Sequence, residues 1–303
     1  MRILVTGGAG FIGSHIVEAY LAEGHEVAVV DNLATGRRAN VPRGATLHEV
    51  DLHALELKTI FAEFQPEIVN HHAAQASVKV GTADPVHDLE VNGGGTARLL
   101  QLAIENGVRK VIYSSSGGTV YGEPEFLPVT EEHPIAPRSN YGTSKYVGEL
   151  YIQLAARTAG VDYTIFRYGN AFGPRQDPHG EAGVIAIFTG LMLAGQPCTI
   201  DGDGEQKKDY LYVGDIARAN VLALTGGSGL VANVGTGEGV TVNHIFRTLS
   251  EATANTIEAQ YGPPRPGDVR NFWLDYSTIE RELGWSPGVR FEEGVRLTVE
   301  SLR

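Results

Sequence analysis

Cysteine and long apolar runs are scarce in this sequence. Cys198 is the single cysteine among 303 residues, so the chain forms no internal disulfide and we expect it in a reducing compartment. Apolar runs such as 184–188 fall far short of the roughly 20 residues that span a bilayer. The first residues, MRILVTGGAG, lack the layout of a secretory signal. We therefore expect a cytoplasmic protein with no membrane partner.

Basic residues are also few. The chain has 24 Lys and Arg against 36 Asp and Glu, and its formal net charge is −12 at pH 7. Such a charge repels nucleic-acid phosphates and anionic lipids at long range, so we expect no nucleic-acid partner. Any anionic ligand must then be held by local features such as a helix N-terminus or a single Arg. The 42% of hydrophobic residues are typical of a globular chain with a sizeable core.

Short β-branched segments alternate with longer amphipathic segments through the first half of the chain. This alternation predicts an α/β fold, in which helices cover both faces of a parallel sheet. Right-handed crossovers make a doubly wound (Rossmann) sheet the expected topology. The predicted strands are 2–6, 26–30, 46–50, 67–70, 110–114 and 163–167, and the predicted helices are 12–23, 55–64, 86–105 and 141–159.

The first predicted strand and helix are joined by a glycine-rich loop with Gly7, Gly10 and Gly13. Glycine lets the backbone turn tightly and approach a pyrophosphate, which the N-terminus of the helix then faces. Asp31 ends the second predicted strand, where a carboxylate accepts both ribose hydroxyls and repels a 2′-phosphate. The pattern predicts NAD as the cofactor, although the arginines at 37 and 38 leave NADP open.

After about residue 170 the pattern changes, because Gly and Pro recur and the segments become shorter and more mixed. We expect residues 1–170 to form the NAD-binding domain and residues 171–303 a smaller, mixed α/β domain that binds the substrate. Residues 209–235 are expected to rejoin the first domain in part.

Tyr141 and Lys145 lie four residues apart, so both project from one face of one predicted helix. Free tyrosine has a pKa near 10 and is a poor base at neutral pH, but a nearby ammonium group favours the phenolate. The serines at 114–116 follow a strand whose carboxyl end borders the expected cofactor crevice. A hydroxyl there can hydrogen-bond the substrate oxygen that Tyr141 deprotonates.

Several longer motifs occur in a fixed order along the chain. They are GGAGFIG at 7–13, DNL at 31–33, DL at 51–52, HHAAQASV at 71–78, DPVHDLEVNGGGT at 84–96, SSSGGTVYG at 114–122, YGTSK at 141–145, RYGNAFGPR at 167–175, GDGEQKKDYLYV at 202–213, RPGD at 265–268 and LGW at 283–285. In this order the chain resembles the extended short-chain dehydrogenase/reductases, and within them the 4-epimerases of nucleotide sugars.

The resemblance implies roles for individual residues. Ser116, Tyr141 and Lys145 would be catalytic, with Ser115 as the fallback for Ser116 because the glycines at 117 and 118 leave the register open. The cofactor would be held by Gly7, Gly10, Phe11, Ile12, Gly13, Asp31, Asn32, Asp51, Leu52, Ala73, Ala74, Asn92, Ser114, Tyr141, Lys145 and Tyr168. The substrate would be held by Ser116, Tyr141, Asn170, Thr199, Ile200, Lys208, Arg265, Asp268 and Phe272.

Two of these substrate positions carry a specific expectation. Lys208 stands where the family usually has Arg, and because lysine lacks the bidentate fork we expect weaker anchoring of the nucleotide there. Phe272 would wall the 2-substituent of the hexose, where a phenyl ring crowds an acetamido group. Plain core packing of Phe272 is the competing interpretation.

The fold serves several reactions, so the serine loop must decide among them. Dehydratases of this family carry Asp-Glu, and decarboxylases a Glu, where this chain has residues 116–118 without an acid. The resemblance therefore implies an NAD-dependent 4-epimerase that interconverts UDP-glucose and UDP-galactose through a transient 4-keto sugar. Epimerisation of UDP-glucuronate or UDP-N-acetylglucosamine is the alternative. An NAD-sensing scaffold protein is a non-enzymatic alternative that the retained Tyr–Lys pair disfavours.

The resemblance also implies a homodimer through the predicted helices 86–105 and 141–159. The adjacent histidines 71 and 72 suggest a metal site, but neighbours on a strand point to opposite faces and no third ligand follows at a suitable spacing. We expect no metal.

Overall fold

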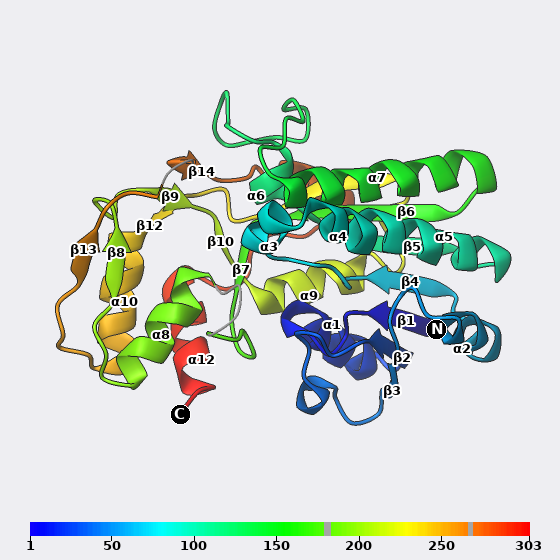
Figure 1. Ribbon diagram of the computed structural model, residues 1–303, viewed down its shortest axis with the longest axis horizontal. Helices are drawn as coiled ribbons and strands as arrows, with labels where there is room; N and C mark the ends of the chain where they lie inside the picture. Colours follow the sequence, from blue (N-terminus) through cyan, green and yellow to red (C-terminus); the bar gives the residue numbers. More distant parts are fainter. Residues whose placement is uncertain (179–182, 266–268) are drawn as a thin grey trace.

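The computed structural model describes residues 1–178, 183–265 and 269–303. Within these residues the centre of the molecule is a seven-stranded sheet in the order β11-β6-β5-β4-β1-β2-β3 (Figure 1). All neighbouring strands are parallel, and the order reverses direction between β1 and β4, which confirms the predicted doubly wound topology. The strands are β1 (Arg2–Thr6), β2 (Glu26–Asp31), β3 (Thr46–Glu49), β4 (Ile68–His71), β5 (Lys110–Ser116), β6 (Asp162–Tyr168) and β11 (Leu230–Val234).

Helices cover both faces of this sheet. Strand residues alternate between the faces, so Ile3 and Val5 of β1 join one apolar cluster whereas Leu4 joins the other. The first face carries α1 (Phe11–Ala22), α9 (Val213–Leu222) and α11 (Ser277–Leu283), and the second carries α2 (Glu56–Phe64), α5 (Gly95–Glu105) and α7 (Asn140–Ala159). Shorter elements between them are η1 (Arg38–Asn40), α3 (Val78–Ala83) and α6 (Gly117–Val120).

The long helix expected at 86–105 is interrupted in the structure. It consists of α4 (Pro85–Leu89), a π-helical turn η2 (Glu90–Gly94) and then α5. Three consecutive glycines at 93–95 lie at this interruption, and glycine weakens the preference for a regular helix. π-turns inside helices are frequently found at functional sites, and this one carries Asn92.

The remaining elements form small sheets and helices beside the large sheet, at the left of Figure 1. Their apolar cluster includes Phe188, Ile200, Ile245 and Val295. The sheets pair β7 (Asn170–Phe172) with β10 (Tyr210–Tyr212), β8 (Thr199–Asp201) with β13 (Gln260–Gly262), and β9 (Lys207–Lys208) with both β12 (Val240–Thr241) and β14 (Asn271–Phe272). The helices are α8 (Val184–Leu193), α10 (Val242–Thr253) and α12 (Phe291–Glu300).

The chain returns twice from the smaller part to the large sheet, first through residues 213–234 and then through α11. Helix α9 packs against α1, and β11 pairs with β6, so residues 213–234 belong to the layers of the large sheet. None of the helices in the described part of the chain combines the length and the apolar character that crossing a membrane requires.

Candidate active site

The glycine-rich loop is packed so closely that side chains are excluded from it. A Cβ on Gly13 would lie 2.2 Å from the Gly7 carbonyl oxygen, and a Cβ on Gly7 would lie 2.6 Å from the Ala73 nitrogen. Gly7 also has a φ of +71°, which an L side chain rarely adopts. Helix α1 begins at Phe11 with Gly10 as its N-cap, and no side chain caps it. The loop therefore leaves the positive end of α1 available to a pyrophosphate.

Two carboxylates lie beside this loop. Asp31, which is 7% exposed, accepts hydrogen bonds from the backbone N–H of Ala9 and of Leu33, each at 2.9 Å. Asp51 accepts one from the Asn32 side-chain amide at 2.8 Å, and a backbone N–H holds the pKa of Asp51 below its usual range. Both side chains are therefore oriented before any ligand binds, as adenosine ribose recognition requires.

The arginines that left NADP open are engaged elsewhere. Arg37 forms an ion pair with Asp177 at 2.6 Å, and Arg38 pairs with Glu49. Both guanidinium groups thus already face a carboxylate, whereas binding a 2′-phosphate would require them to leave it.

A second loop of the expected cofactor site follows β4. The Ala73 N–H donates to the Thr6 hydroxyl at 3.2 Å, and the Asn92 side chain both accepts from the Gln75 N–H at 2.9 Å and donates to the Ser144 hydroxyl at 2.9 Å. The π-turn that carries Asn92 therefore connects this loop to α7. Ala74 lies in the same loop, and Leu52 is buried beneath the cluster of the second face.

The two histidines of the HHAAQ motif have separate environments. His71 is buried, and its ring contacts the hydroxyls of Thr6 at 2.7 Å and Thr96 at 2.9 Å. His72 stacks on Tyr168 and contacts its hydroxyl at 3.2 Å through Nε2. Burial lowers the pKa of His72 to about 3, so the ring is neutral. Among the described residues the buried Nδ1 of His72 has no hydrogen-bond partner, which fits a site that a ligand completes.

The Tyr–Lys pair lies on α7, which begins where the Ser139 side chain accepts a hydrogen bond from the Gly142 N–H. Burial raises the pKa of Tyr141 to about 12, and a hydrogen bond with the Ser116 side chain opposes that rise. Lys145 is 2% exposed, and burial lowers its pKa to about 7. Its Nζ lies 4.5 Å from the centre of the Tyr113 ring.

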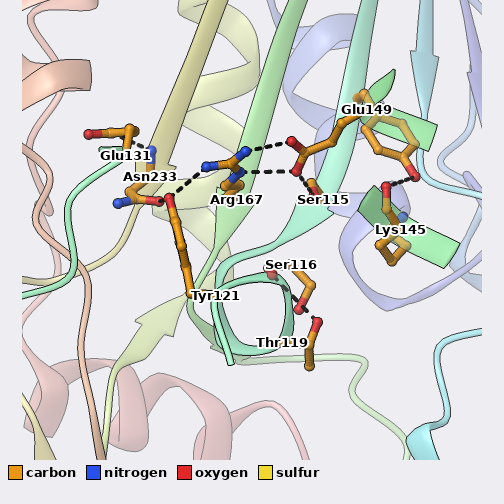
Figure 2. Close-up of polar contacts among 10 residues, drawn as sticks. Ser115, Ser116, Thr119, Tyr121, Glu131, Lys145, Glu149, Arg167 and Asn233 are labelled. Carbon is orange, nitrogen blue, oxygen red and sulfur yellow. Dashed lines mark hydrogen bonds and ion pairs between the residues drawn. The ribbon is translucent and has the colours of Figure 1, made fainter. Parts of the chain in front are cut away.

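The two serines at the end of β5 face different partners. Ser115 is buried and donates to the Glu149 carboxylate at 2.5 Å, as Figure 2 shows. Ser116 lies one residue further along and forms the N-cap of α6 without using its side chain there. Its side chain lies close enough to Tyr141 to lower the pKa of that phenol. The geometry therefore brings Ser116, and not Ser115, to the Tyr–Lys pair. Ser114 is the residue before Ser115 on β5.

A cavity of about 860 Å³ lies among the small sheets. Such a volume is in the range of sites for nucleotide-sized ligands. The Arg265 guanidinium forms an ion pair with Asp201 at 2.5 Å, and the Lys208 ammonium donates to the Val269 carbonyl. Five residues expected at the substrate line this cavity: Asn170, Thr199, Ile200, Lys208 and Arg265.

Of the other two expected substrate residues, Asp268 falls outside the described residues, and Phe272 does not line this cavity. Phe272 is 3% exposed and belongs to an apolar cluster with Val120, Val129 and Leu274. This position agrees with the core-packing interpretation and leaves the contact with a hexose as a prediction.

Comparisons with known proteins agree on one family. Residues 3–235 match the model of the NAD-dependent epimerase/dehydratase family. The chain is similar to a UDP-glucose 4-epimerase from Thermotoga maritima solved with UDP-glucose, at 48% identity and a TM-score of 0.98, over 100% of this chain and 99% of that one. It is also similar to the Thermus thermophilus UDP-glucose 4-epimerase in complex with NAD, at 49% identity and a TM-score of 0.95, with the same coverage.

A third similar structure has a different named substrate. It is a UDP-N-acetylglucosamine 4-epimerase from Methanobrevibacter ruminantium M1 in complex with UDP-N-acetylmuramic acid. It shares 36% identity with this chain at a TM-score of 0.94, over 99% of this chain and 97% of that one.

We expect Gly13→Ala to weaken NAD binding by more than about tenfold, because the added Cβ would displace the loop against the Gly7 carbonyl. The dissociation constant, measured by calorimetry on protein stripped of cofactor, checks this. Gly94→Ala is the matched control, since a Cβ there meets nothing closer than 3.8 Å. Unchanged NAD affinity in Gly13→Ala would show that this loop does not hold the cofactor.

Proposed function

The chain belongs to the NAD-dependent epimerase/dehydratase family and is a UDP-sugar epimerase, and we propose that it interconverts UDP-glucose and UDP-galactose by inverting C4. The observation that carries this proposal is Ser116 beside Tyr141, one helical turn from a buried Lys145, with no carboxylate among residues 116–118.

The loop after β5 argues against dehydration and decarboxylation. Elimination of water from a 4-keto sugar needs a further acid/base pair near C5 and C6, and residues 116–118 are Ser-Gly-Gly. A Cβ on Gly117 would lie 2.7 Å from a Leu274 methyl group, so position 117 does not accommodate an acidic side chain. What the site can supply is removal and return of one proton.

Tyr141 carries out that proton transfer, and two further side chains assist it. The phenolate of Tyr141 takes the proton from the 4-hydroxyl and later returns it, while Ser116 hydrogen-bonds the same oxygen and orients it. The ammonium of Lys145 stabilises the phenolate and holds the ribose of the cofactor. NAD, when bound, supplies reversible two-electron oxidation at the sugar C4. The cofactor is held by the glycine-rich loop, Asp31 and the loop after β4.

Inversion requires that both faces of C4 be presented in turn. The UDP portion must therefore stay bound while the hexose turns about its diphosphate linkage. We assign UDP to the cavity that Asn170, Thr199, Ile200, Lys208 and Arg265 line, with Asp268 as a further ligand. The Arg265 guanidinium, which lines this cavity beside Asp201, would supply positive charge and parallel N–H donors to the diphosphate.

We also propose a homodimer through α4, α5 and α7. Helix α7 packs against both α4 and α5, and the three lie side by side in Figure 1. Their outer face carries large exposed apolar side chains, which is typical of an interface between subunits. These are Val86, Leu89, Ile104, Leu150, Tyr151 and Leu154, each between 41% and 65% exposed.

The proposed reaction is tested by incubating the purified protein with UDP-galactose and no added cofactor. We expect UDP-glucose to form, because a cofactor restored in each turnover has no need to leave. Proton NMR of the anomeric region follows the conversion. If added NAD does not produce conversion either, UDP-glucuronate and the N-acetylated UDP-hexoses are tested next, and turnover of one of these alone would replace the proposed substrate.

We expect Tyr141→Phe to lower kcat at least ~100-fold, because phenylalanine can neither take nor return a proton. Steady-state rates with UDP-galactose check this expectation. Tyr163→Phe, at the N-terminal end of β6 and so at the edge of the sheet away from this pair, loses the same hydroxyl and keeps normal rates. Near-normal turnover by Tyr141→Phe would rule out this mechanism.

We expect the double variant Leu150→Glu, Leu154→Glu to be monomeric, because it places four carboxylates in an apolar symmetric interface. Light scattering coupled to size-exclusion chromatography measures the mass. Leu193→Glu, an exposed leucine on α8, is the control and leaves the mass unchanged. A wild-type mass of one chain, or a dimeric double variant, contradicts the proposed interface.

A further inference from the structure

An ion pair is buried directly behind the serines of β5. Glu149 of α7 is 0% exposed and Arg167 of β6 is 5% exposed. Two parallel hydrogen bonds join them, from Arg167 Nη2 at 2.6 Å and from Nε at 3.0 Å (Figure 2). Apolar residues of similar volume often stabilise a core as well as a buried ion pair does, so stability alone does not account for the pair.

The sheet register explains how the pair reaches the active site. Ser115 of β5 lies opposite Arg167 of β6, and cross-strand neighbours share one face of the sheet. Both side chains therefore point toward α7, where the Glu149 carboxylate accepts the Ser115 hydroxyl at 2.5 Å. Glu149 thereby anchors the end of β5 to α7 directly before Ser116, which leaves the strand as the N-cap of α6.

Glu149 also lies one helical turn after Lys145, on the same side of α7. Two carboxylates favour the charged form of Lys145, Glu149 more strongly and Asp88 less. In the resting protein the other groups that face Lys145 do not add negative charge. Tyr141 carries its proton, because burial raises its pKa to about 12. Tyr113 offers its ring face, and the buried histidines 71 and 72 are neutral, because burial holds the pKa of each below its usual range.

Arg167 supplies the counter-charge of this buried carboxylate. Its remaining Nη1 donates to the Tyr121 hydroxyl at 2.9 Å, and Tyr121 donates to the Asn233 side chain at 2.7 Å. The chain of contacts ends at Glu131, which accepts from the Asn233 N–H at 2.7 Å (Figure 2). The pair is thus fully hydrogen-bonded and fixed from both sides, as a buried charge requires.

We propose that Glu149, held by Arg167, is a positioning residue of the active site with two effects. It anchors Ser115, and with it the end of β5 from which Ser116 leaves the strand, and it supplies negative charge that favours the protonated form of Lys145. The catalytic consequence rests on the proposed function, whereas the effect on Lys145 can be measured without any substrate.

The direct test follows the charge of Lys145 by NMR, from the ¹³Cε chemical shift in protein labelled on lysine. Loss of the signal in Lys145→Met identifies it. In Glu149→Gln we expect Lys145 to lose its proton at a lower pH than in the wild-type chain, because the nearby negative charge is gone. Glu131→Gln is the matched control, since it removes a carboxylate from the same chain of contacts at its far end and leaves the Lys145 titration unchanged.

A single substitution leaves Arg167 buried without a counter-charge and can unfold the chain. The double variant Glu149→Gln, Arg167→Met removes both charges and keeps the volume. It is expected to fold and to show an earlier deprotonation of Lys145 than the wild-type chain, but by a smaller shift than in Glu149→Gln, because the positive charge of Arg167 is removed as well. A Lys145 titration in both Glu149 variants that matches the wild-type chain overturns the proposal, whatever the enzyme does with UDP-sugars.

The pH profile of kcat distinguishes charge from packing. Lys145 acts protonated, so a lower pKa removes activity above that pKa and leaves it intact below. We expect a loss of about tenfold above neutral pH that diminishes toward acid pH. A loss by the same factor at every pH, with an unmoved titration, would show a purely structural role and overturn the proposal. If the Lys145 pKa is lower in the Glu149 variants but the wild-type protein epimerises no UDP-sugar, the proposed function is contradicted and the role of Glu149 toward Lys145 stands.

Discussion

A lysine ammonium enclosed by protein is the constraint on which the active site depends. Lys145 lies under the Tyr113 ring, and Gly148 allows this approach, because a Cβ there would lie 2.3 Å from the Tyr113 hydroxyl oxygen. Burial lowers the pKa of Lys145 and raises the pKa of Tyr141. In a buried site, nearby charges shift the pKa of each group strongly. Such shifts can bring the pKa values close to neutral pH, where a side chain can both take up and release a proton.

The carboxylates around this lysine are themselves held by polar side chains. Asp88 accepts hydrogen bonds from Ser144 and from the Gln75 side chain, and Glu149 accepts from Ser115 and Arg167. A buried carboxylate left without such partners would take up a proton and lose its effect on Lys145. The polar side chains behind α7 therefore stabilise the two carboxylates that favour the charged form of Lys145.

The cavity of the small sheets must keep its place relative to this site. Asp209, between β9 and β10, accepts hydrogen bonds from the backbone N–H groups of Thr236 and Leu274, while its carbonyl oxygen accepts from Asn170. Burial raises the pKa of Asp209 to about 6. One buried residue thereby joins the segments after β11 and β14 to the first residue of β7, which lines the cavity.

Local patterns in the sequence were enough to predict the doubly wound sheet, the glycine-rich loop, NAD and the Tyr141–Lys145 pair, because spacing along one strand or helix already places these groups. The choice between Ser115 and Ser116 depended on which residue faces Glu149 across two elements. The π-turn at 90–94 and the burial of Phe272 likewise depended on packing partners far away in the chain. The i, i+4 spacing of Lys145 and Glu149 was visible in the sequence, but the ion pair of Glu149 with Arg167 was not. Periodicity along the chain reports which face a residue occupies, whereas only tertiary structure decides which residue of another element meets it there.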